Sequence, residues 1–187
     1  SGSMLEYYDY MIFTYMMPLF MPILLPFKTM SESILFGYGL IFAAAILRPL
    51  GALFMGYIGD VFGRKYGLMI SVFLISLASF AMGLMPSYAS IGVWTVYLVF
   101  VLRIFQAMSA GGDLNGSAIF LIEHLGEKPG LASGLAWVAT VIGMIFASFA
   151  NYIATKLHPY GWRFAFIIGG LIGFTSIFMR RQIVEGE

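Results

Sequence analysis

The chain has 187 residues, of which 60% are hydrophobic and only 10% are charged. A water-soluble domain carries about 25% charged residues, so this composition excludes an ordinary soluble surface and indicates that a lipid bilayer is the solvent. The formal net charge of +1 gives no support for nucleic-acid binding, and the lack of cysteine excludes disulfides and cysteine-based metal sites.

Six apolar runs in the chain are long enough to cross a bilayer. In hydrocarbon, only helices satisfy their own backbone groups without closing a barrel, and each needs about 20 apolar residues. The sequence therefore predicts an all-α membrane protein with six transmembrane helices, at 5–26, 34–58, 67–85, 93–122, 131–156 and 162–180. Residues 1–3 precede Met4 and read as an expression-tag scar, and residues 4–187 read as one six-helix bundle.

The distribution of lysine and arginine predicts the orientation in the membrane. With a cytoplasmic N-terminus, the cytoplasmic loops and the C-terminal tail hold five basic residues: Arg64, Lys65, Lys128, Arg180 and Arg181. The outer loops then hold three, namely Lys28, Lys156 and Arg163. This bias follows the positive-inside rule, and it predicts that both termini are cytoplasmic.

The first predicted helix carries two carboxylates. Glu6 and Asp9 lie one turn apart and share a helix face. The aromatic residues Tyr10 and Phe13 follow the Asp9 face, which makes them candidate substrate contacts. Glu6 has a second interpretation, as a solvated residue at the start of the helix.

The second predicted helix carries an arginine near the middle of the membrane. Arg48 lies about ten residues from the cytoplasmic end, which is about 15 Å by helical rise. A charge at that depth costs at least about 2.5–3.5 kcal/mol, so it needs a partner or a watery cavity. Arg48 either pairs with a carboxylate or only clamps the second helix.

A polar turn is predicted at 59–66, within the stretch "GYIGDVFGRKYG" at 56–67. Two glycines are expected to allow close helix approach, and a third to allow an unusual backbone angle. A carboxylate lies at the helix end, and two cations follow the third glycine. The residues are, in order, Gly56, Gly59, Asp60, Gly63, Arg64 and Lys65. The stretch is either a simple positive-inside turn or a charge latch that ties helix ends together in one conformation.

The fourth predicted helix carries a polar stripe. At 100° per residue, Arg103, Gln106 and Asp113 fall within about an 80° arc, together with Ala110 and Ser117. A static ion pair that fixes helix packing is the alternative to a functional role. Glu123, at the end of this helix, belongs either to a cytoplasmic charge network or to a solvated helix end.

Several of these segments resemble the major facilitator superfamily. The run from Gly56 to Lys65 resembles the loop 2–3 signature of that family, although Val61 stands where a basic residue is usual. "LEYYDYMIF", "RIFQAMSAGGDLNGSAIFLIEH" and the ending "MRRQIVE" resemble the metabolite:proton symporter branch, which includes proline/betaine, citrate, oxoglutarate and shikimate carriers. Ala107 replaces a usual Gly and Asp113 a usual Glu.

The resemblance implies one half of a transporter fold. Such carriers have twelve helices, so six helices correspond to the N-terminal half, built from two inverted three-helix repeats. Because the family's first and fourth helices line the cavity, the proton-coupling candidates are Asp9, Asp113, Glu6 and Arg103. The substrate-binding candidates are Arg48, Arg103, Gln106, Tyr10 and Phe13. The glycine-rich turn with Glu123 and Arg181 is expected to form a cytoplasmic gate.

The expected function is half of a proton-coupled symporter for a small zwitterionic or carboxylate metabolite in the bacterial inner membrane. The expected partners are membrane lipid, protons, the substrate and a second six-helix half, which is a second copy or a C-terminal half. No cofactor, metal or nucleic acid is expected.

Two other interpretations stay open. One is an inert transporter fragment. The other, a rhomboid-like serine protease, needs Gly-x-Ser-Gly and an intramembrane His; Gly130 to Gly134 is one residue too long around Ser133, and no such His is present.

Overall fold

The computed structural model describes residues 2–27, 29–125, 129–157 and 159–184, without the side chains of 2, 64–65, 112–125, 129, 132 and 179–184. These residues form six long helices and one short one, and no strand occurs among them. The helices are α1 (Gly2–Leu24), α2 (Met30–Phe62), α3 (Arg64–Gly83), α4 (Tyr88–Ile91), α5 (Trp94–Leu125), α6 (Pro129–Lys156) and α7 (Gly161–Val184). The all-α prediction is confirmed.

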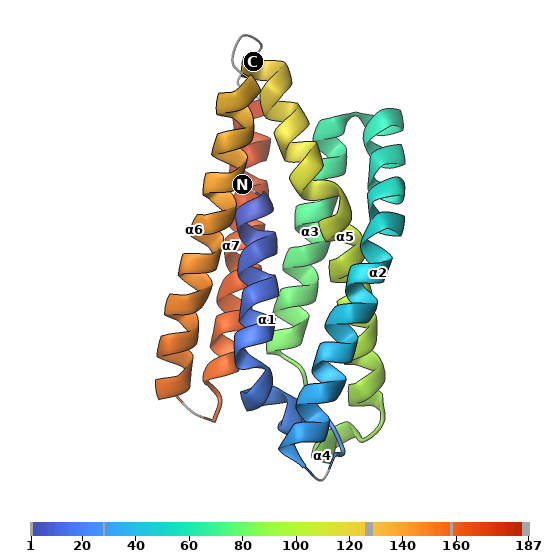
Figure 1. The fold of residues 1–187 in the computed structure, drawn as a ribbon, viewed down its shortest axis with the longest axis vertical. Helices are drawn as coiled ribbons and strands as arrows, with labels where there is room; N and C mark the ends of the chain where they lie inside the picture. The colour runs from blue at the N-terminus through green and yellow to red at the C-terminus, as the bar shows by residue number, and fades with distance from the viewer. Residues whose placement is uncertain (1, 28, 126–128, 158, 185–187) are drawn as a thin grey trace.

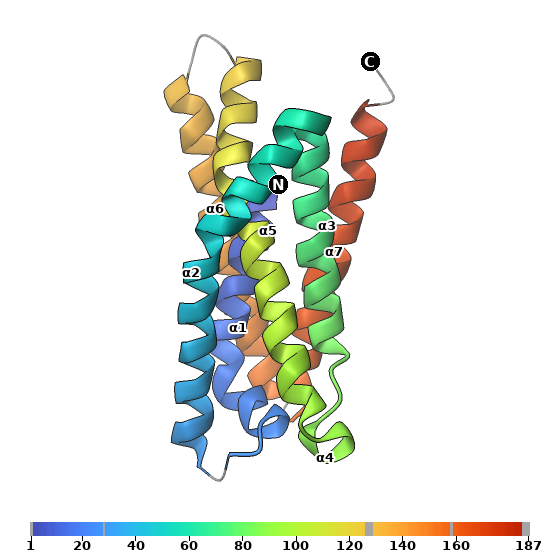
Figure 2. The same ribbon diagram turned by 90° about the vertical axis from the view of Figure 1, so that its right-hand side faces the viewer.

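The six long helices run side by side along the long axis of the molecule (Figure 1). Helices α6 and α7 lie on one side of α1, and α2, α3 and α5 lie on the other. One end of the bundle holds the α2–α3 junction and the C-terminal ends of α5 and α7, and α4 lies at the opposite end (Figure 2). This up-and-down arrangement is the one expected for successive membrane crossings.

Helix α1 forms most of the core. Its apolar side chains are buried on several faces, and Phe20 stacks edge-on against Phe13 and Phe166. Trp162 of α7 is buried beside the same ring. The buried core residues of α1 include Ile12, Met16, Met17, Met21 and Leu24. The first helix is therefore enclosed by the others.

Among the described residues, five helices are long and apolar enough to cross a membrane: α2 and segments of α3, α5, α6 and α7. Helix α1, which carries Glu6, Asp9 and several tyrosines, is not one of these five. Six membrane spans therefore remain a prediction, while five are supported by length and composition. Large apolar side chains such as Leu53, Phe42 and Trp94 are exposed on the outer surface, as expected for contact with lipid.

The predicted polar turn at 59–66 is wrong in extent. Helix α2 continues through Phe62 and α3 begins at Arg64, so Gly63 is the single residue between them. Gly63 has φ 97° and ψ 140°, a backbone conformation that other residues rarely adopt, which confirms the angle expected there. Gly56, Gly59 and Asp60 consequently lie inside α2.

Backbone-to-backbone approach at glycines fixes the helix crossings. A Cβ on Gly51 would collide with the Met108 carbonyl, and one on Gly111 with the Arg48 carbonyl, so α2 and α5 touch directly. Gly143 of α6 faces the Met4 carbonyl of α1 in the same way. These contacts set where the side chains of α1, α2 and α5 meet.

Of the two glycines expected to let α2 approach a neighbour, one does so. A Cβ on Gly67 of α3 would lie 3.3 Å from the Gly59 Cα, which confirms close approach at Gly59. The expectation for Gly56 is wrong, because a Cβ there would face open space.

Candidate functional site

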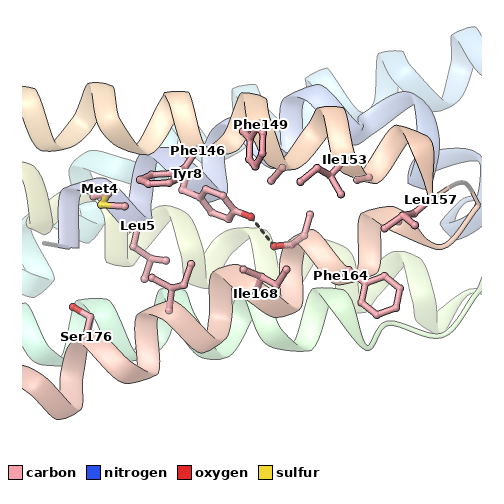
Figure 3. A pocket seen from close by; sticks show the side chains of 15 residues that line it. Met4, Leu5, Tyr8, Phe146, Phe149, Ile153, Leu157, Phe164, Ile168 and Ser176 are labelled. Atoms are coloured by element: carbon pink, nitrogen blue, oxygen red, sulfur yellow. Dashed lines mark hydrogen bonds between the residues drawn. The ribbon is translucent and has the colours of Figure 1, made fainter.

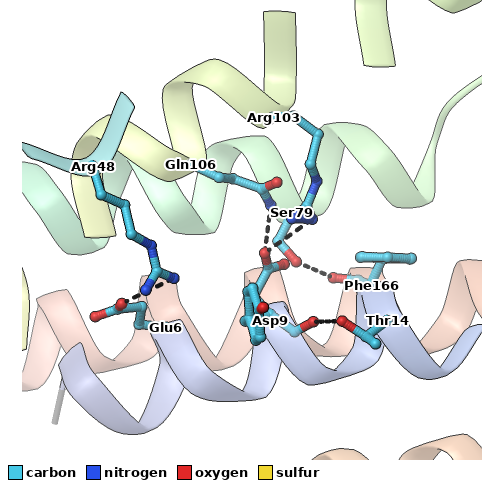
Figure 4. Close-up of polar contacts among 9 residues, drawn as sticks. Glu6, Asp9, Thr14, Arg48, Ser79, Arg103, Gln106 and Phe166 are labelled. Carbon is cyan, nitrogen blue, oxygen red and sulfur yellow. Dashed lines mark hydrogen bonds and ion pairs between the residues drawn. The ribbon is translucent and has the colours of Figure 1, made fainter. Parts of the chain in front are cut away.

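Two ion pairs connect α1 to its neighbours on one side of the bundle (Figure 4). Glu6 Oε1 lies 3.5 Å from Nη2 of Arg48 on α2. One turn further along α1, Asp9 Oδ2 lies 3.5 Å from Nη2 of Arg103 on α5. The 3.6-residue helical period aims both carboxylates at the same face, where the α2–α5 crossing presents both arginines.

The inner pair is almost completely buried. Asp9 is 3% exposed and Arg103 is 5% exposed. Gln106, one turn beyond Arg103 on α5, donates from Nε2 to Asp9 Oδ2 over 2.7 Å. The Arg103 guanidinium carbon lies 3.5 Å from the centre of the Phe13 ring, so an aromatic face covers the cation.

Some polar atoms of this inner cluster make no hydrogen bond within the part of the chain that the structure describes. They are Asp9 Oδ1, Gln106 Oε1, and Nε and Nη2 of Arg103. Buried polar atoms without partners are costly, so such a cluster is suited to receiving a proton, water or a ligand group. Ser79 of α3 lies beside Asp9 and donates instead to the Phe166 carbonyl over 3.2 Å (Figure 4).

The outer pair is more accessible. The Arg48 side chain is 36% exposed, whereas its partner Glu6 is 5% exposed. The Tyr10 ring lies 5.3 Å from the Arg48 guanidinium carbon, within the range of a cation–π contact. Glu6 is thus buried against an arginine, and its interpretation as a solvated residue at the helix start is wrong.

A polar cavity of about 70 Å³ lies between the two pairs. Both arginines and both carboxylates line it together with Gln106. Its remaining walls are Tyr10, Ile41, Ala44, Ala45, Ile75, Ala107 and Ala110. This volume corresponds to about two water molecules, so the charged side chains share a small polar space inside the bundle.

A larger cavity of about 490 Å³ lies between α1, α6 and α7 (Figure 3). Apolar side chains such as Phe149, Ile153 and Ile168 line it. The Tyr8 hydroxyl beside it donates to the Ala165 carbonyl over 2.9 Å. With only the Tyr8 and Ser176 hydroxyls among its apolar lining, this cavity offers space for apolar chains but no charged group.

Apart from Gly56, Gly59 and Gly63, whose places in the fold are given above, the predicted site residues fall into three sets. Glu6, Asp9, Tyr10, Phe13, Arg48, Arg103 and Gln106 come together around the polar cavity and its aromatic cover. Asp60 is exposed on α2. The side chains of Asp113, Glu123, Arg64, Lys65 and Arg181 lie outside the described residues, so their roles in proton coupling and in the cytoplasmic gate remain predictions.

Sequence reasoning missed Ser79 and the pair of glycines at the α2–α5 crossing. Ser79 has a weak signal, since Ser76 and Ser79 are polar residues one turn apart in an apolar helix. Among the described residues, no cluster of three or more histidine, aspartate or glutamate side chains is arranged to hold a metal ion.

A bundle of lipid-exposed helices around a buried cavity with paired charges defines a multi-pass membrane protein of the transporter class. Residues 1–182 match the family described as sugar (and other) transporter, and the chain belongs to this family. The match confirms the resemblance to the major facilitator superfamily.

Two relatives agree with the metabolite:proton symporter branch. The chain is 27% identical to the alpha-ketoglutarate permease of Escherichia coli K12, over 99% of this chain and 44% of that protein. It is 27% identical to the proline/betaine transporter of Salmonella typhimurium LT2, over 98% of this chain and 38% of that protein. The chain thus spans less than half the length of these relatives. No solved structure matches it.

Proposed function

We propose that this chain forms half of a proton-coupled symporter for a small zwitterionic or carboxylate metabolite. The observation that carries the proposal is the buried Asp9–Arg103 pair, which faces a polar cavity inside a transporter-family bundle. An ionised pair at this position costs desolvation energy that a simple packing role would not require. Intramembrane charges of this kind mark ion and substrate pathways.

The proton-coupling step uses Asp9. When Asp9 takes up a proton, its attraction for Arg103 falls, because one charge of the pair is lost. Gln106 still reaches the carboxyl group, so the residue stays in place while the guanidinium is released. A change in this contact between α1 and α5 alters the relative stability of two conformations, as alternating access requires. Asp113 and Glu6 are the further proton-carrier candidates.

The substrate contacts are Arg48, Arg103 and Gln106, with the rings of Tyr10 and Phe13 beside them. Arginine binds carboxylates through paired N–H donors, and aromatic faces attract cations. The names of the two relatives combine these chemistries, since one is a dicarboxylate permease and the other a proline/betaine transporter. A small zwitterion or carboxylate therefore fits both the residues and the family.

A second six-helix half completes the carrier in this proposal. The two halves of the family fold are related by an axis along the membrane normal, so an even number of spans gives both halves the same orientation. The second half is either a C-terminal half or a second copy of this chain, with both termini cytoplasmic in the bacterial inner membrane. Substrate crosses between the halves by alternating access.

Proteoliposomes test this function. Radiolabelled proline, glycine betaine and α-ketoglutarate serve as probes, with an inward proton gradient imposed by an acidic exterior. We expect accumulation of at least one probe, and its collapse when a protonophore is added. Asp9→Asn should lose gradient-driven accumulation yet retain exchange of internal for external substrate. Glu32→Gln, an equal charge change at the exposed start of α2, is the control and should behave as wild type.

Asp113→Asn is measured in the same vesicles. Wild-type proton-driven accumulation in this variant would remove Asp113 from the coupling machinery without affecting the role of Asp9. Accumulation that ignores the proton gradient in the wild-type protein would reject the symporter proposal as a whole.

An inert fragment is the second candidate, favoured by the short span of the chain relative to its relatives. Crosslinking in native-like lipid distinguishes the two. A monomer that neither pairs nor transports any probe supports the fragment. The protease alternative receives no support, because the matched relatives are transporters; a serine-hydrolase probe is expected to leave Ser133 unlabelled.

A further inference from the structure

The two ion pairs of the site differ in how accessible they are. Asp9 and Arg103 are both buried, and Asp9 accepts a short hydrogen bond from Gln106 as well. The two pairs have the same 3.5 Å distance between nitrogen and oxygen, but the Arg48 side chain is 36% exposed. The outer pair is therefore the more accessible of the two to a ligand.

The charges around the cavity limit which ligand is acceptable. The described residues that line it include two arginines and two carboxylates, whose formal charges cancel. A dicarboxylate would add two negative charges beside Glu6 and Asp9 in a poorly solvated space, where uncompensated charge is expensive. A zwitterion adds one charge of each sign and leaves the sum unchanged.

We propose, on the basis of the function proposed above, that the Arg48–Glu6 pair is the binding site for a zwitterion, which inserts between the two side chains. The ligand carboxylate replaces Glu6 on the Arg48 guanidinium, and the cationic end of the ligand takes the place of Arg48 beside Glu6. Each buried charge keeps a partner of opposite sign throughout, so the exchange avoids the cost of an unpaired charge.

Neighbouring side chains suit both ends of such a ligand. Tyr10 already presents its ring to a cation, the Arg48 guanidinium, and the same ring can face an ammonium group. Ala44 and Ala45 line the wall on α2, so short side chains leave room near Arg48 when the pair separates. The site therefore selects a compact molecule with a carboxylate at one end and a positive charge at the other.

Equilibrium binding to the purified protein in lipid nanodiscs, by isothermal titration calorimetry, tests the inference with four probes. Glycine betaine carries both charges, and 3,3-dimethylbutyrate has the same shape with carbon in place of the charged nitrogen. Choline supplies the cation without the carboxylate, and α-ketoglutarate is the dicarboxylate. We expect glycine betaine to bind at least about tenfold more tightly than each of the others.

Single variants test which residues cause the preference for glycine betaine over the other probes. In Glu6→Gln, the preference for glycine betaine over 3,3-dimethylbutyrate should fall below about threefold, because the anion is no longer repelled and the cation no longer attracted. Glu6→Asp keeps the charge and should keep the preference. Arg48→Gln should weaken the binding of glycine betaine and of 3,3-dimethylbutyrate by at least about tenfold, while the binding of choline changes little. Glu32→Gln and Lys156→Gln are charge-matched controls at exposed positions and should bind as wild type.

The outcomes separate this inference from the function on which it rests. A preference that survives in Glu6→Gln, or tightest binding of α-ketoglutarate to the wild-type protein, would overturn the zwitterion site while leaving proton-coupled transport standing. Failure of all four probes to bind, together with no uptake in proteoliposomes, would contradict both.

Discussion

Replacing Arg103 with glutamine should destabilise the bundle by several kcal/mol, because it leaves a buried carboxylate without its cation. In Arg103→Gln, the Asp9 carboxylate stays buried and loses its cation, and breaking a buried pair in this way costs about 3–5 kcal/mol. The Gln106 hydrogen bond remains but carries no positive charge. Arg48→Gln removes the cation beside Glu6, whose side chain is 5% exposed, so this change should also be destabilising.

A double variant tests whether the cost belongs to the pair. Asp9→Asn with Arg103→Gln removes both charges, so the buried site holds no unpaired ion. We expect the double variant to be more stable than Arg103→Gln alone, with a coupling energy of about 2–3 kcal/mol. Additive effects in this cycle would mean that the two residues do not act as a pair.

Thermal unfolding in detergent, followed by tryptophan fluorescence, measures these differences. For a chain of this length, 1 kcal/mol shifts Tm by about 2–4 °C, so Arg103→Gln should lower Tm by about 6–20 °C. A wild-type Tm for Arg103→Gln would refute the reasoning that the pair is ionised and desolvated.

Three further changes probe the helix contacts by the same unfolding measurement. Gly51→Ala places a methyl group against the Met108 backbone and should cost about 1–3 kcal/mol of stability. Gly39→Ala on the same helix faces open space and should be neutral or slightly stabilising. Equal Tm values for the two variants would contradict close backbone contact at Gly51. Tyr8→Phe removes the hydrogen bond to the α7 backbone and should cost about 0.5–1.5 kcal/mol, and an unchanged Tm would show that this bond adds nothing. Gly63→Ala forces a residue with a side chain into φ 97° and should cost about 1–3 kcal/mol of stability. An unchanged Tm would show that this backbone conformation is not required at the α2–α3 junction.

Helical periodicity was sufficient to predict one half of the site. Arg103 and Gln106 lie three residues apart, so any helix places them on one face, and both reach the same carboxylate. Glu6 and Asp9 share a face for the same reason. Long apolar runs likewise predicted the helices to within a few residues at most ends.

The partner of each charge could not be predicted from periodicity. Arg48 meets Glu6 because α2 crosses α5 with backbones in contact at Gly51 and Gly111, which is a property of the assembled bundle. The chain has 22 glycines, and local sequence does not distinguish those at crossings from those facing open space. The predicted length of the α2–α3 turn was wrong for a related reason. Gly63 alone reverses the chain, so its polar neighbours remain helical.

Tight contacts hold neighbouring helices together on either side of the two ion pairs. Gly51 and Gly111 hold α2 against α5, while Gly143 and the Tyr8 hydroxyl hold α1 against α6 and α7. Both ion pairs cross between these two groups of helices, at an interface that contains the polar cavity. Because close-packed backbones resist sliding, a proton on Asp9 or a ligand on Arg48 acts at a contact that charged side chains make between α1 and the α2–α5 pair. Uptake of either one at this interface therefore changes the attraction between the two groups of helices without first breaking their internal packing.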